Sequence, residues 1–199
     1  MKRLIVGFVG YKDSGKSTTA RLLRKSLETS TVASLKVDSY SFSQPIYNIL
    51  IGLGVPYENV YDNDRRDDSL EDFDGKTSRE MMITLGTGWG RNVISEKIWI
   101  VSGIKKIEKS KFNIVTIDGI RFPNEMEEIE KHGGVFIHIK NDRARERVEA
   151  GIVDESESHT EWLANRCDFE VDNTKYDVEK MIPLLSHLVI ERYKMLQKN

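Results

Sequence analysis

Short apolar runs alternate along this chain with stretches in which apolar residues recur every three or four positions. The runs at 4–9, 112–117 and 135–139 have the length and the β-branched content of buried strands. Shorter segments of the same kind lie at 31–35 and 169–173. Because helical periodicity fills the intervals between these strands, the pattern predicts an α/β fold with a doubly wound parallel sheet of about five strands.

The helical stretches differ in how their ends are marked. Apolar spacing predicts helices, in chain order, at about 18–27, 44–53, 79–85, 92–109, 125–131, 141–147 and 177–197. Gly86 is expected to end the third helix, and Pro183 is expected to kink or break the last one. Trp99 recurs at helical spacing, which is typical of a core residue.

A polar, acidic region at 54–76 interrupts this pattern. It has two interpretations: a solvated, mobile excursion, or an insertion that covers the substrate, as long loops in compact domains often do. The helical segments around it predict a substrate-binding insertion with a lid at about 41–110. The core would then comprise about 1–40 and 111–199, and the whole chain is expected to form a single domain.

Composition excludes several classes of protein. The 199-residue chain is 39% hydrophobic, and its formal net charge of −2 gives no support for bulk electrostatic binding to nucleic acid or to a membrane. The lone cysteine, Cys167, excludes an intramolecular disulfide and a multi-cysteine zinc site. No apolar run reaches the length of a membrane span, and the run at 4–9 reads as a core strand and not as a signal peptide. We therefore expect a cytoplasmic protein with no nucleic-acid or membrane partner.

The segment at 10–17 carries the clearest chemical signal. It reads G-Y-K-D-S-G-K-S, which matches the phosphate-binding pattern G-x-x-x-x-G-K-S, and it lies between a predicted strand and a predicted helix as that motif requires. Glycines allow the backbone to approach an anion closely, and the loop N–H groups and the helix N-terminus attract it. We expect Lys16 to reach the β- and γ-phosphates of a nucleoside triphosphate, and Ser17 to bind Mg²⁺. The candidate nucleotide-binding residues are Gly10, Lys12, Asp13, Ser14, Gly15, Lys16, Ser17 and Thr18.

Further charged groups follow predicted strands, where ligands of parallel sheets bind. Asp118 ends the strand at 112–117 and is placed to hold Mg²⁺ or its water ligands; the alternative is a cap for the next turn. Arg143 and Arg147 share one face of the helix that begins at 141. They form either a solvated surface or a clamp on phosphates, which arginine binds through fixed, paired donors.

Several strings recur in the order in which one known family has them. They are 10–17 (G-Y-K-D-S-G-K-S, here called the phosphate loop), 42–45 (F-S-Q-P), 78–80 (S-R-E), 85–91 (L-G-T-G-W-G-R), 117–125 (I-D-G-I-R-F-P-N-E) and 158–161 (S-H-T-E). Together they resemble the phage-type deoxynucleoside monophosphate kinases over nearly the whole chain. The resemblance implies a P-loop kinase fold and the reaction of Mg·ATP with a deoxynucleoside monophosphate (dNMP) to give ADP and dNDP. It also makes a homodimer plausible, and it implies the host cytoplasm if the chain is phage-encoded.

Phosphoryl transfer needs positioning and charge neutralisation, which suggests roles for the remaining residues. The candidates for catalysis are Lys16, Arg121, Arg143 and Arg147, and the last two would close over the transferring γ-phosphoryl group. The candidates for binding substrate are Lys36, Phe42, Arg79, Trp89, Arg91, Asp118 and Arg121. Among these, the arginines would hold the acceptor phosphate, and Phe42 and Trp89 would stack on its base.

Other functions stay open at this point. Another small-molecule kinase of this fold, such as a dephospho-coenzyme A kinase, would carry the same loop, and so would a nucleotide-dependent switch or ATPase. The sequence lacks the N-K-x-D motif expected of a GTPase, which favours ATP as the donor. The near-neutral charge disfavours an ATPase of DNA packaging or recombination. The accepted bases and the choice between deoxyribose and ribose do not follow from the residues.

Overall fold

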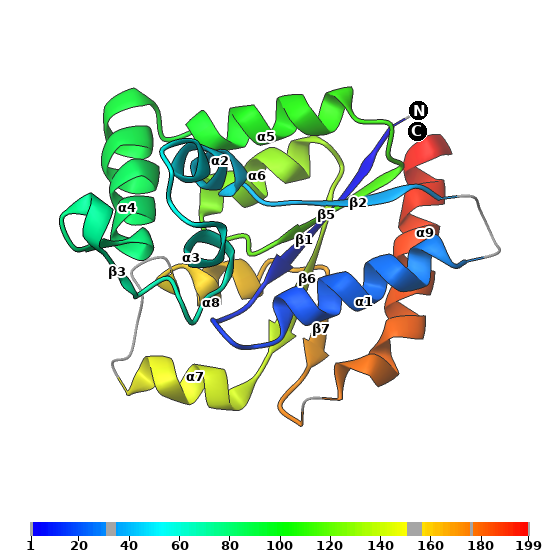
Figure 1. Cartoon of the computed structure of the whole chain (residues 1–199). Helices are drawn as coiled ribbons and strands as arrows, with labels where there is room; N and C mark the ends of the chain where they lie inside the picture. Colours follow the sequence, from blue (N-terminus) through cyan, green and yellow to red (C-terminus); the bar gives the residue numbers. More distant parts are fainter. Residues whose placement is uncertain (1, 31–34, 151–156, 176, 199) are drawn as a thin grey trace. The chain divides into compact units, whose positions relative to one another are not determined.

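The chain folds into two compact units (Figure 1). This computed structural model describes residues 2–30, 35–150, 157–175 and 177–198. The first unit comprises Met1–Tyr40 and Ile107–Asn199, and the second comprises Ser41–Lys106. Among the described residues, no helix has the length and apolar character needed to cross a membrane.

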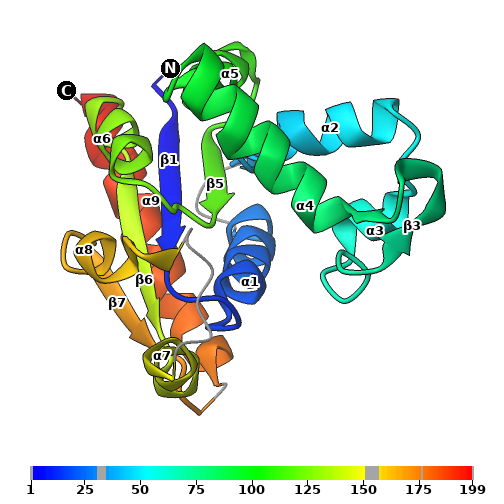
Figure 2. The same cartoon turned by 90° about the vertical axis from the view of Figure 1, so that its left-hand side faces the viewer.

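The sheet of the first unit has five parallel strands, as predicted. They are β1 (Leu4–Val9), β2 (Val37–Tyr40), β5 (Ile114–Asp118), β6 (Val135–Lys140) and β7 (Phe169–Asp172), in the order β2-β5-β1-β6-β7. Strand β1 is buried along its whole length, and Figure 2 shows it running in the same direction as β5 and β6. In this register Leu4 pairs with Ile114 and Phe8 pairs with Asp118. The carboxyl ends of β1 and β5 therefore lie side by side.

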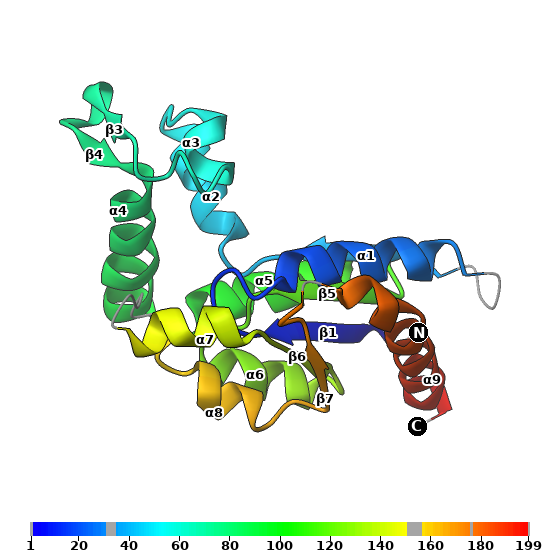
Figure 3. The same ribbon diagram turned by 90° about the horizontal axis from the view of Figure 1, so that it is seen from below.

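Helices cover both faces of this sheet. They are α1 (Lys16–Glu28), α6 (Pro123–Lys131), α7 (Asp142–Glu149), α8 (Thr160–Ala164), a 3₁₀ turn at Val178–Met181 and α9 (Ile182–Lys198). The α1 and α9 helices contact each other and share one apolar core with Leu4, Val6 and Ile137 of the strands. Figure 3 shows α6 and α8 on the opposite side of β1 from α1.

One strand lies later in the chain than the apolar pattern predicts. We expected it at 31–35, but β2 forms at Val37–Tyr40, and residues 31–34 lie outside the described part of the chain. Both Val37 and Tyr40 are buried, and β2 pairs along its whole length with β5. Strand formation at Val37–Tyr40 is therefore explained by pairing and burial against β5.

The last helix differs from its prediction at its start. The chain forms a 3₁₀ turn at Val178–Met181, and α9 begins only at Ile182. Pro183 thus lies in the first turn of α9, where its missing N–H interrupts no helical hydrogen bond. The break expected near Pro183 is confirmed, and it falls just before the proline.

The second unit is built from short helices around a small apolar core. Its elements are α2 (Gln44–Gly52), α3 (Tyr57–Tyr61), β3 (Ser69–Leu70), a 3₁₀ turn at Glu71–Phe73, β4 (Lys76–Thr77), α4 (Ser78–Ile83), a π-helix at Thr84–Ile94 and most of α5 (Ile98–Lys109). The acidic region 54–76 is therefore no structureless excursion, because it forms α3 and the antiparallel β3–β4 pair. Its residues Val55 and Val60 are buried with Leu50 in the core of this unit.

The glycine-rich segment after α4 is helical, contrary to prediction. The α4 helix continues directly into the π-helix at Thr84–Ile94, and α5 begins after it and not near 92. Gly86, which we expected to end the helix, is buried within it, and a Cβ atom there would lie 2.9 Å from Cδ1 of Ile46. Glycine therefore serves close packing at this position and does not end the helix.

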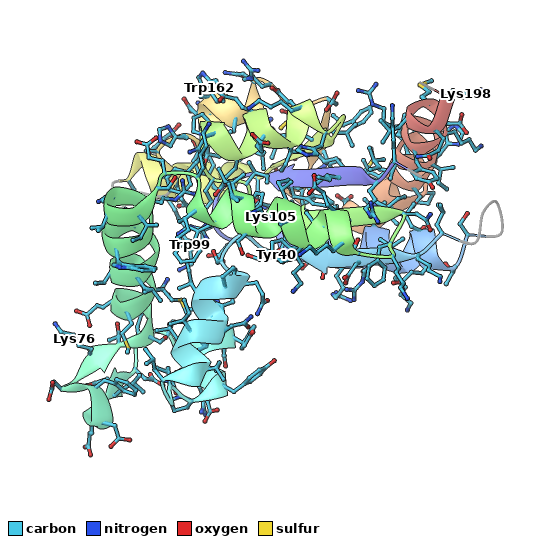
Figure 4. All side chains as sticks on the ribbon, turned by 90° about the horizontal axis from the view of Figure 1, so that it is seen from above. Tyr40, Lys76, Trp99, Lys105, Trp162 and Lys198 are labelled. Atoms are coloured by element: carbon cyan, nitrogen blue, oxygen red, sulfur yellow. The ribbon has the colours of Figure 1, made fainter. Side chains whose placement is uncertain are left out.

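Trp99 explains a second close approach in this segment. Its side chain, labelled in Figure 4, is only 5% exposed, and Nε1–H donates to the Gly86 carbonyl at 2.8 Å. A Cβ atom on Gly90 would lie 2.4 Å from Cζ2 of the indole. The predicted core role of Trp99 is confirmed.

Candidate phosphate-binding site

The loop between β1 and α1 leaves the sheet at its carboxyl end. Positive φ angles at Gly10 (149°), Asp13 (63°) and Gly15 (100°) turn the backbone, and the Ser14 N–H donates to the Tyr11 carbonyl at 3.1 Å. The first turn of α1, which is fully described, has no acidic residue, and Gly15 offers no capping side chain. Since the first N–H groups of a helix have no partner within it, this end of α1 is suited to an anion.

The Lys16 side chain folds back over this loop. Its ammonium group donates to the carbonyl oxygens of Gly10 and Tyr11, both at 2.6 Å. Burial, and after it the nearby guanidinium of Arg121, lowers the pKa of Lys16 from 10.5 to about 8. A phosphate in the loop would offer the ammonium a full negative charge in place of two carbonyl dipoles.

Ser17 and Asp118 meet beside the loop, because β1 and β5 end next to each other. Asp118 is the last residue of β5, and Ser17 lies in the first turn of α1, directly after the loop that follows β1. Burial raises the pKa of Asp118, and the hydrogen bond from Ser17 and the charges of Lys16 and Arg121 oppose this rise. The two residues that we expected to hold a metal are thus brought together.

The chemistry of this pair fits Mg²⁺. The ion prefers oxygen ligands, and proteins usually bind it through one or two side chains together with substrate phosphates and water. The Ser17 hydroxyl and the Asp118 carboxylate, which lie close enough for Ser17 to affect the pKa of Asp118, would supply two such oxygens. Within the described ranges, no group of three or more His, Cys, Asp or Glu side chains could hold a metal.

The α7 helix brings an arginine to the phosphate loop. Arg147 donates to the Asp13 carboxylate at 2.5 Å. Glu157, which lies just before α8, also contacts the loop: its carboxylate accepts a hydrogen bond from the backbone N–H of Lys12. Arg143, the other arginine predicted to clamp phosphates, is exposed, and its role stays a prediction.

Arg121 follows β5 and lies near the same site. Its charge affects the pKa values of both Lys16 and Asp118. The backbone N–H of Arg121 donates to Oε2 of Glu125 at 2.8 Å, and the N–H of Phe122 donates to the same oxygen at 3.2 Å. Because Glu125 is buried at the start of α6, this carboxylate fixes the backbone that carries Arg121.

The two candidate arginines of the second unit have partners of their own. Arg79 forms a bidentate ion pair with Asp67, with Nε–Oδ1 and Nη2–Oδ2 distances of 2.6 and 3.0 Å. Arg91 donates through Nη1 to the Glu96 carbonyl at 3.1 Å. Asp67 is one of many acidic residues at 54–76, so the sequence does not single it out. The roles of both arginines in acceptor binding stay predictions.

The two aromatic candidates of this unit differ in exposure. Trp89 is 43% exposed, whereas Phe42 is only 6% exposed. Trp89 can therefore present part of its ring to a base, while neighbouring groups cover Phe42. Both stacking roles stay predictions.

Lys36 lies apart from the phosphate loop. It would follow a strand at 31–35, but it precedes β2 in the structure. Its backbone exchanges hydrogen bonds with Asn113, the residue just before β5, at 2.8 Å in both directions. Lys36 therefore lies at the amino end of the parallel sheet, and the loop lies at the carboxyl end. The shift of the strand moves this candidate away from the others.

Asn173 contacts the loop, although the sequence pattern assigned it no role. Its Nδ2 donates to the Ser14 carbonyl at 2.9 Å, and its Oδ1 accepts from the N–H of Val178 at 3.2 Å. Its backbone N–H donates to the Lys140 carbonyl at 2.8 Å, and its own carbonyl accepts from Nδ2 of Asn141 at 2.9 Å. The available signal is its position directly after β7, at the carboxyl end of the sheet.

By sequence, the chain matches no protein-family model and no curated protein. Solved structures with a similar arrangement include a putative kinase from Chloroflexus aurantiacus, at 14% identity over 98% of this chain and 97% of that chain, with a TM-score of 0.48. They also include shikimate kinase from Aquifex aeolicus (12% identity, 94% and 99% covered, TM-score 0.46) and APS kinase from Mycobacterium tuberculosis (12% identity, 97% and 98% covered, TM-score 0.45).

Proposed function

We propose that the chain is a kinase that transfers the γ-phosphoryl group of ATP to a dNMP, with ADP and dNDP as products. The observation that carries the proposal is the convergence of Lys16, the Ser17–Asp118 pair and Arg147 around one glycine-containing loop at the carboxyl end of a parallel sheet. These groups supply the positive charge and the metal ligands that phosphoryl transfer needs. The reaction requires little covalent chemistry from the protein itself.

In this proposal the loop and the start of α1 bind the triphosphate of ATP. The Lys16 ammonium exchanges its two carbonyl partners for phosphate oxygens. Ser17 and Asp118 would hold Mg²⁺, which neutralises charge on the phosphates when it is bound. An oxygen of the acceptor phosphate forms a bond to the γ-phosphorus as the bond to the β–γ bridging oxygen breaks, and ADP leaves. Arg121 and Arg147 would stabilise the charge that develops.

The choice of acceptor rests on the sequence resemblance. The strings at 78–91 and 117–125 resemble those of the phage-type dNMP kinases. The 41–106 unit, which carries Arg79, Trp89 and Arg91, is proposed as the substrate-binding insertion of a kinase core. A kinase of another small phosphorylated metabolite would share the donor site, so the acceptor is what the experiment must identify.

Product analysis tests this proposal. The protein is incubated with Mg·ATP and, separately, with each common dNMP and NMP, and the products are resolved by anion-exchange chromatography. We expect dNDP to form one for one with ADP. Lys16→Ala should lower the rate by about 100- to 1,000-fold, the range for loss of one preorganised electrostatic group. Lys25→Ala removes an exposed lysine from the last turn of the same helix, and this control should retain full activity.

Three other results would contradict parts of the proposal. ADP without a new diphosphate would indicate an ATPase or a switch. No ADP in any reaction of folded protein would reject a dNMP acceptor and would extend the assay to dephospho-coenzyme A and other phosphorylated metabolites. NDP formed as readily as dNDP would keep the kinase and reject a preference for deoxyribose.

A further inference from the structure

We infer that Asn173 is a positioning residue that fixes the conformation of the phosphate loop and couples the loop to α7. The inference rests on the proposed binding of ATP by this loop. It assigns to the segment after β7 a function in the donor site, although Asn173 itself need not touch the nucleotide.

The Asn173 side chain lies directly against the loop. The residue is 3% exposed, and its Nδ2–H donates to the carbonyl oxygen of Ser14 at 2.9 Å. A Cβ atom added to Gly15 would lie 2.4 Å from the same nitrogen. The amide therefore fills the space beside Gly15, so this position excludes a side chain through Asn173 as well as through its φ angle of 100°. Asn173 thus holds the peptide between Ser14 and Gly15, just before Lys16.

The orientation of this amide is fixed by a second bond. Its Oδ1 accepts from the N–H of Val178 at 3.2 Å, so the group cannot rotate without losing both side-chain bonds. The Asn173 backbone N–H donates to the Lys140 carbonyl at 2.8 Å and thereby extends the pairing of β6 with β7 by one residue. A buried amide held in this way is a rigid support for the loop.

The same residue is joined to the start of α7. Its carbonyl oxygen accepts from Nδ2 of Asn141 at 2.9 Å, and Oδ1 of Asn141 caps α7 through the N–H of Ala144 at 3.1 Å. The α7 helix carries Arg147, which reaches the phosphate loop. The loop that binds the donor phosphates and the helix that carries a proposed clamp arginine therefore share one buried support.

Loss of the Asn173 side chain should weaken the binding of ATP and leave the binding of the acceptor unchanged. Without the Asn173 donor, the buried Ser14 carbonyl loses its hydrogen bond, and the loop gains alternative conformations. Binding of ATP must then order the loop again, which weakens affinity. Acceptor binding, which the proposal assigns to the 41–106 unit, should not change.

Two variants and a control test the inference. Asn173→Leu removes the donor at similar volume, and Asn173→Asp keeps the shape and the acceptor for Val178 but cannot donate to Ser14 when ionised. We expect each to raise both the Kd for Mg·ATP, measured by calorimetry, and the KM for ATP by about 5- to 10-fold, as for loss of one hydrogen bond. The KM for the acceptor should stay unchanged. Asn165→Leu alters an exposed asparagine after α8, and this control should bind ATP normally.

The outcomes separate a positioning role from a merely structural one. Loss of kcat with parallel changes in both KM values would indicate general destabilisation and overturn the inference. An unchanged Kd for ATP in either folded variant would also overturn it, provided that the wild-type protein binds ATP. If the leucine variant fails to fold, the near-isosteric aspartate variant decides the question. Failure of the wild-type protein to bind Mg·ATP would overturn the proposed function and this inference together.

Discussion

The two units present their proposed phosphate-binding cations in different ways. In the first unit, the Lys16 ammonium donates to two backbone carbonyls, Gly10 and Tyr11. In the second unit, the Arg79 guanidinium donates through two nitrogens to the Asp67 carboxylate. A phosphate can replace neutral carbonyls at Lys16 without separating an ion pair. At Arg79 it must displace a carboxylate, which uses the same paired geometry that a phosphate would use.

This difference suggests distinct roles for the two sets of partners. The carbonyls around Lys16 belong to the loop itself, so they keep the ammonium at the proposed donor site. The side chain of Asp67 is 65% exposed and that of Arg79 is 27% exposed. A partly exposed ion pair contributes on the order of 1 kcal/mol even with bidentate geometry, so a phosphate can replace the carboxylate. We interpret Asp67 as a group that orients Arg79 for a phosphate and does not block it.

The largest effect that tests this comparison concerns Arg79. If Arg79 holds the acceptor phosphate, Arg79→Ala should raise the KM for the acceptor by about 10- to 100-fold, the range for loss of hydrogen bonds to a charged group. The KM for ATP should not change, because the proposal assigns ATP to the first unit. Asp67→Asn should change the acceptor KM by no more than about threefold, since we interpret Asp67 as orienting Arg79 and not as contacting the acceptor. Steady-state kinetics with each substrate varied in turn measures both.

Arg65→Ala is the matched control for this pair of variants. Arg65 is an exposed arginine of the same unit, and its Nη1 lies 3.9 Å from Oε1 of Glu58. Because the proposal assigns Arg65 no contact with either substrate, its removal should leave both KM values unchanged. Equal changes in the KM values for ATP and the acceptor would remove Arg79 from the acceptor site. A much lower acceptor KM in Asp67→Asn would indicate that Asp67 competes with the acceptor.

Glycine serves backbone conformation at some positions and close packing at others, and a matched pair in the second unit tests the second reason. Gly10 and Gly15 of the first unit have positive φ angles, whereas Gly90 is needed for contact with Trp99. Gly90→Ala should therefore lower the free energy of unfolding by about 1–3 kcal/mol through overpacking. Gly88→Ala, in the same π-helix, places its Cβ atom where nothing lies within 4 Å, and it should be neutral or stabilise by up to about 1 kcal/mol.

Urea denaturation followed by tryptophan fluorescence measures these two effects. Similar unfolding midpoints for the two alanine variants would show that the contact with Trp99 is not what requires glycine at position 90.

The parts of the site that were predicted are those fixed by local pattern. A strand of apolar residues before the glycine loop and a helix after it were predicted and are present, and β1 and β5 end side by side, which places Asp118 near Ser17. Both follow from the rule that ligands bind at the carboxyl ends of parallel strands.

The parts that were missed depend on contacts between distant segments. Lys36 was misplaced because pairing with β5 sets the position of β2. Gly86 reads as a helix end, yet it packs against Ile46 in the middle of a continuous helical segment. Asn173 acts through a hydrogen bond to Ser14, 159 residues away, and a single sequence contains no signal for such a contact.

The smallest expected effect concerns the protonation of Lys16 and sharpens the comparison with Arg79. Burial lowers the pKa of Lys16 to about 8, whereas an arginine stays charged throughout the working range. Below pH 8 the ammonium is charged with or without ATP. Above it, the free protein loses this proton and the phosphates restore it, so binding takes up a proton and affinity falls as the pH rises. Relative to lower pH, the affinity for ATP should be about twofold weaker at pH 8, with uptake of about half a proton.

Calorimetry at pH 8 in buffers of different ionisation enthalpy measures this uptake directly. Lys16→Arg keeps the positive charge at all these pH values, so its weaker binding should show little proton uptake and a flat pH profile. Equal uptake by the wild type and by Lys16→Arg would assign the proton to another group. Because burial lowers the pKa of Lys16 to about 8 and an arginine stays protonated, the charge of Lys16 depends on ligand and pH in a way that the charge of Arg79 does not.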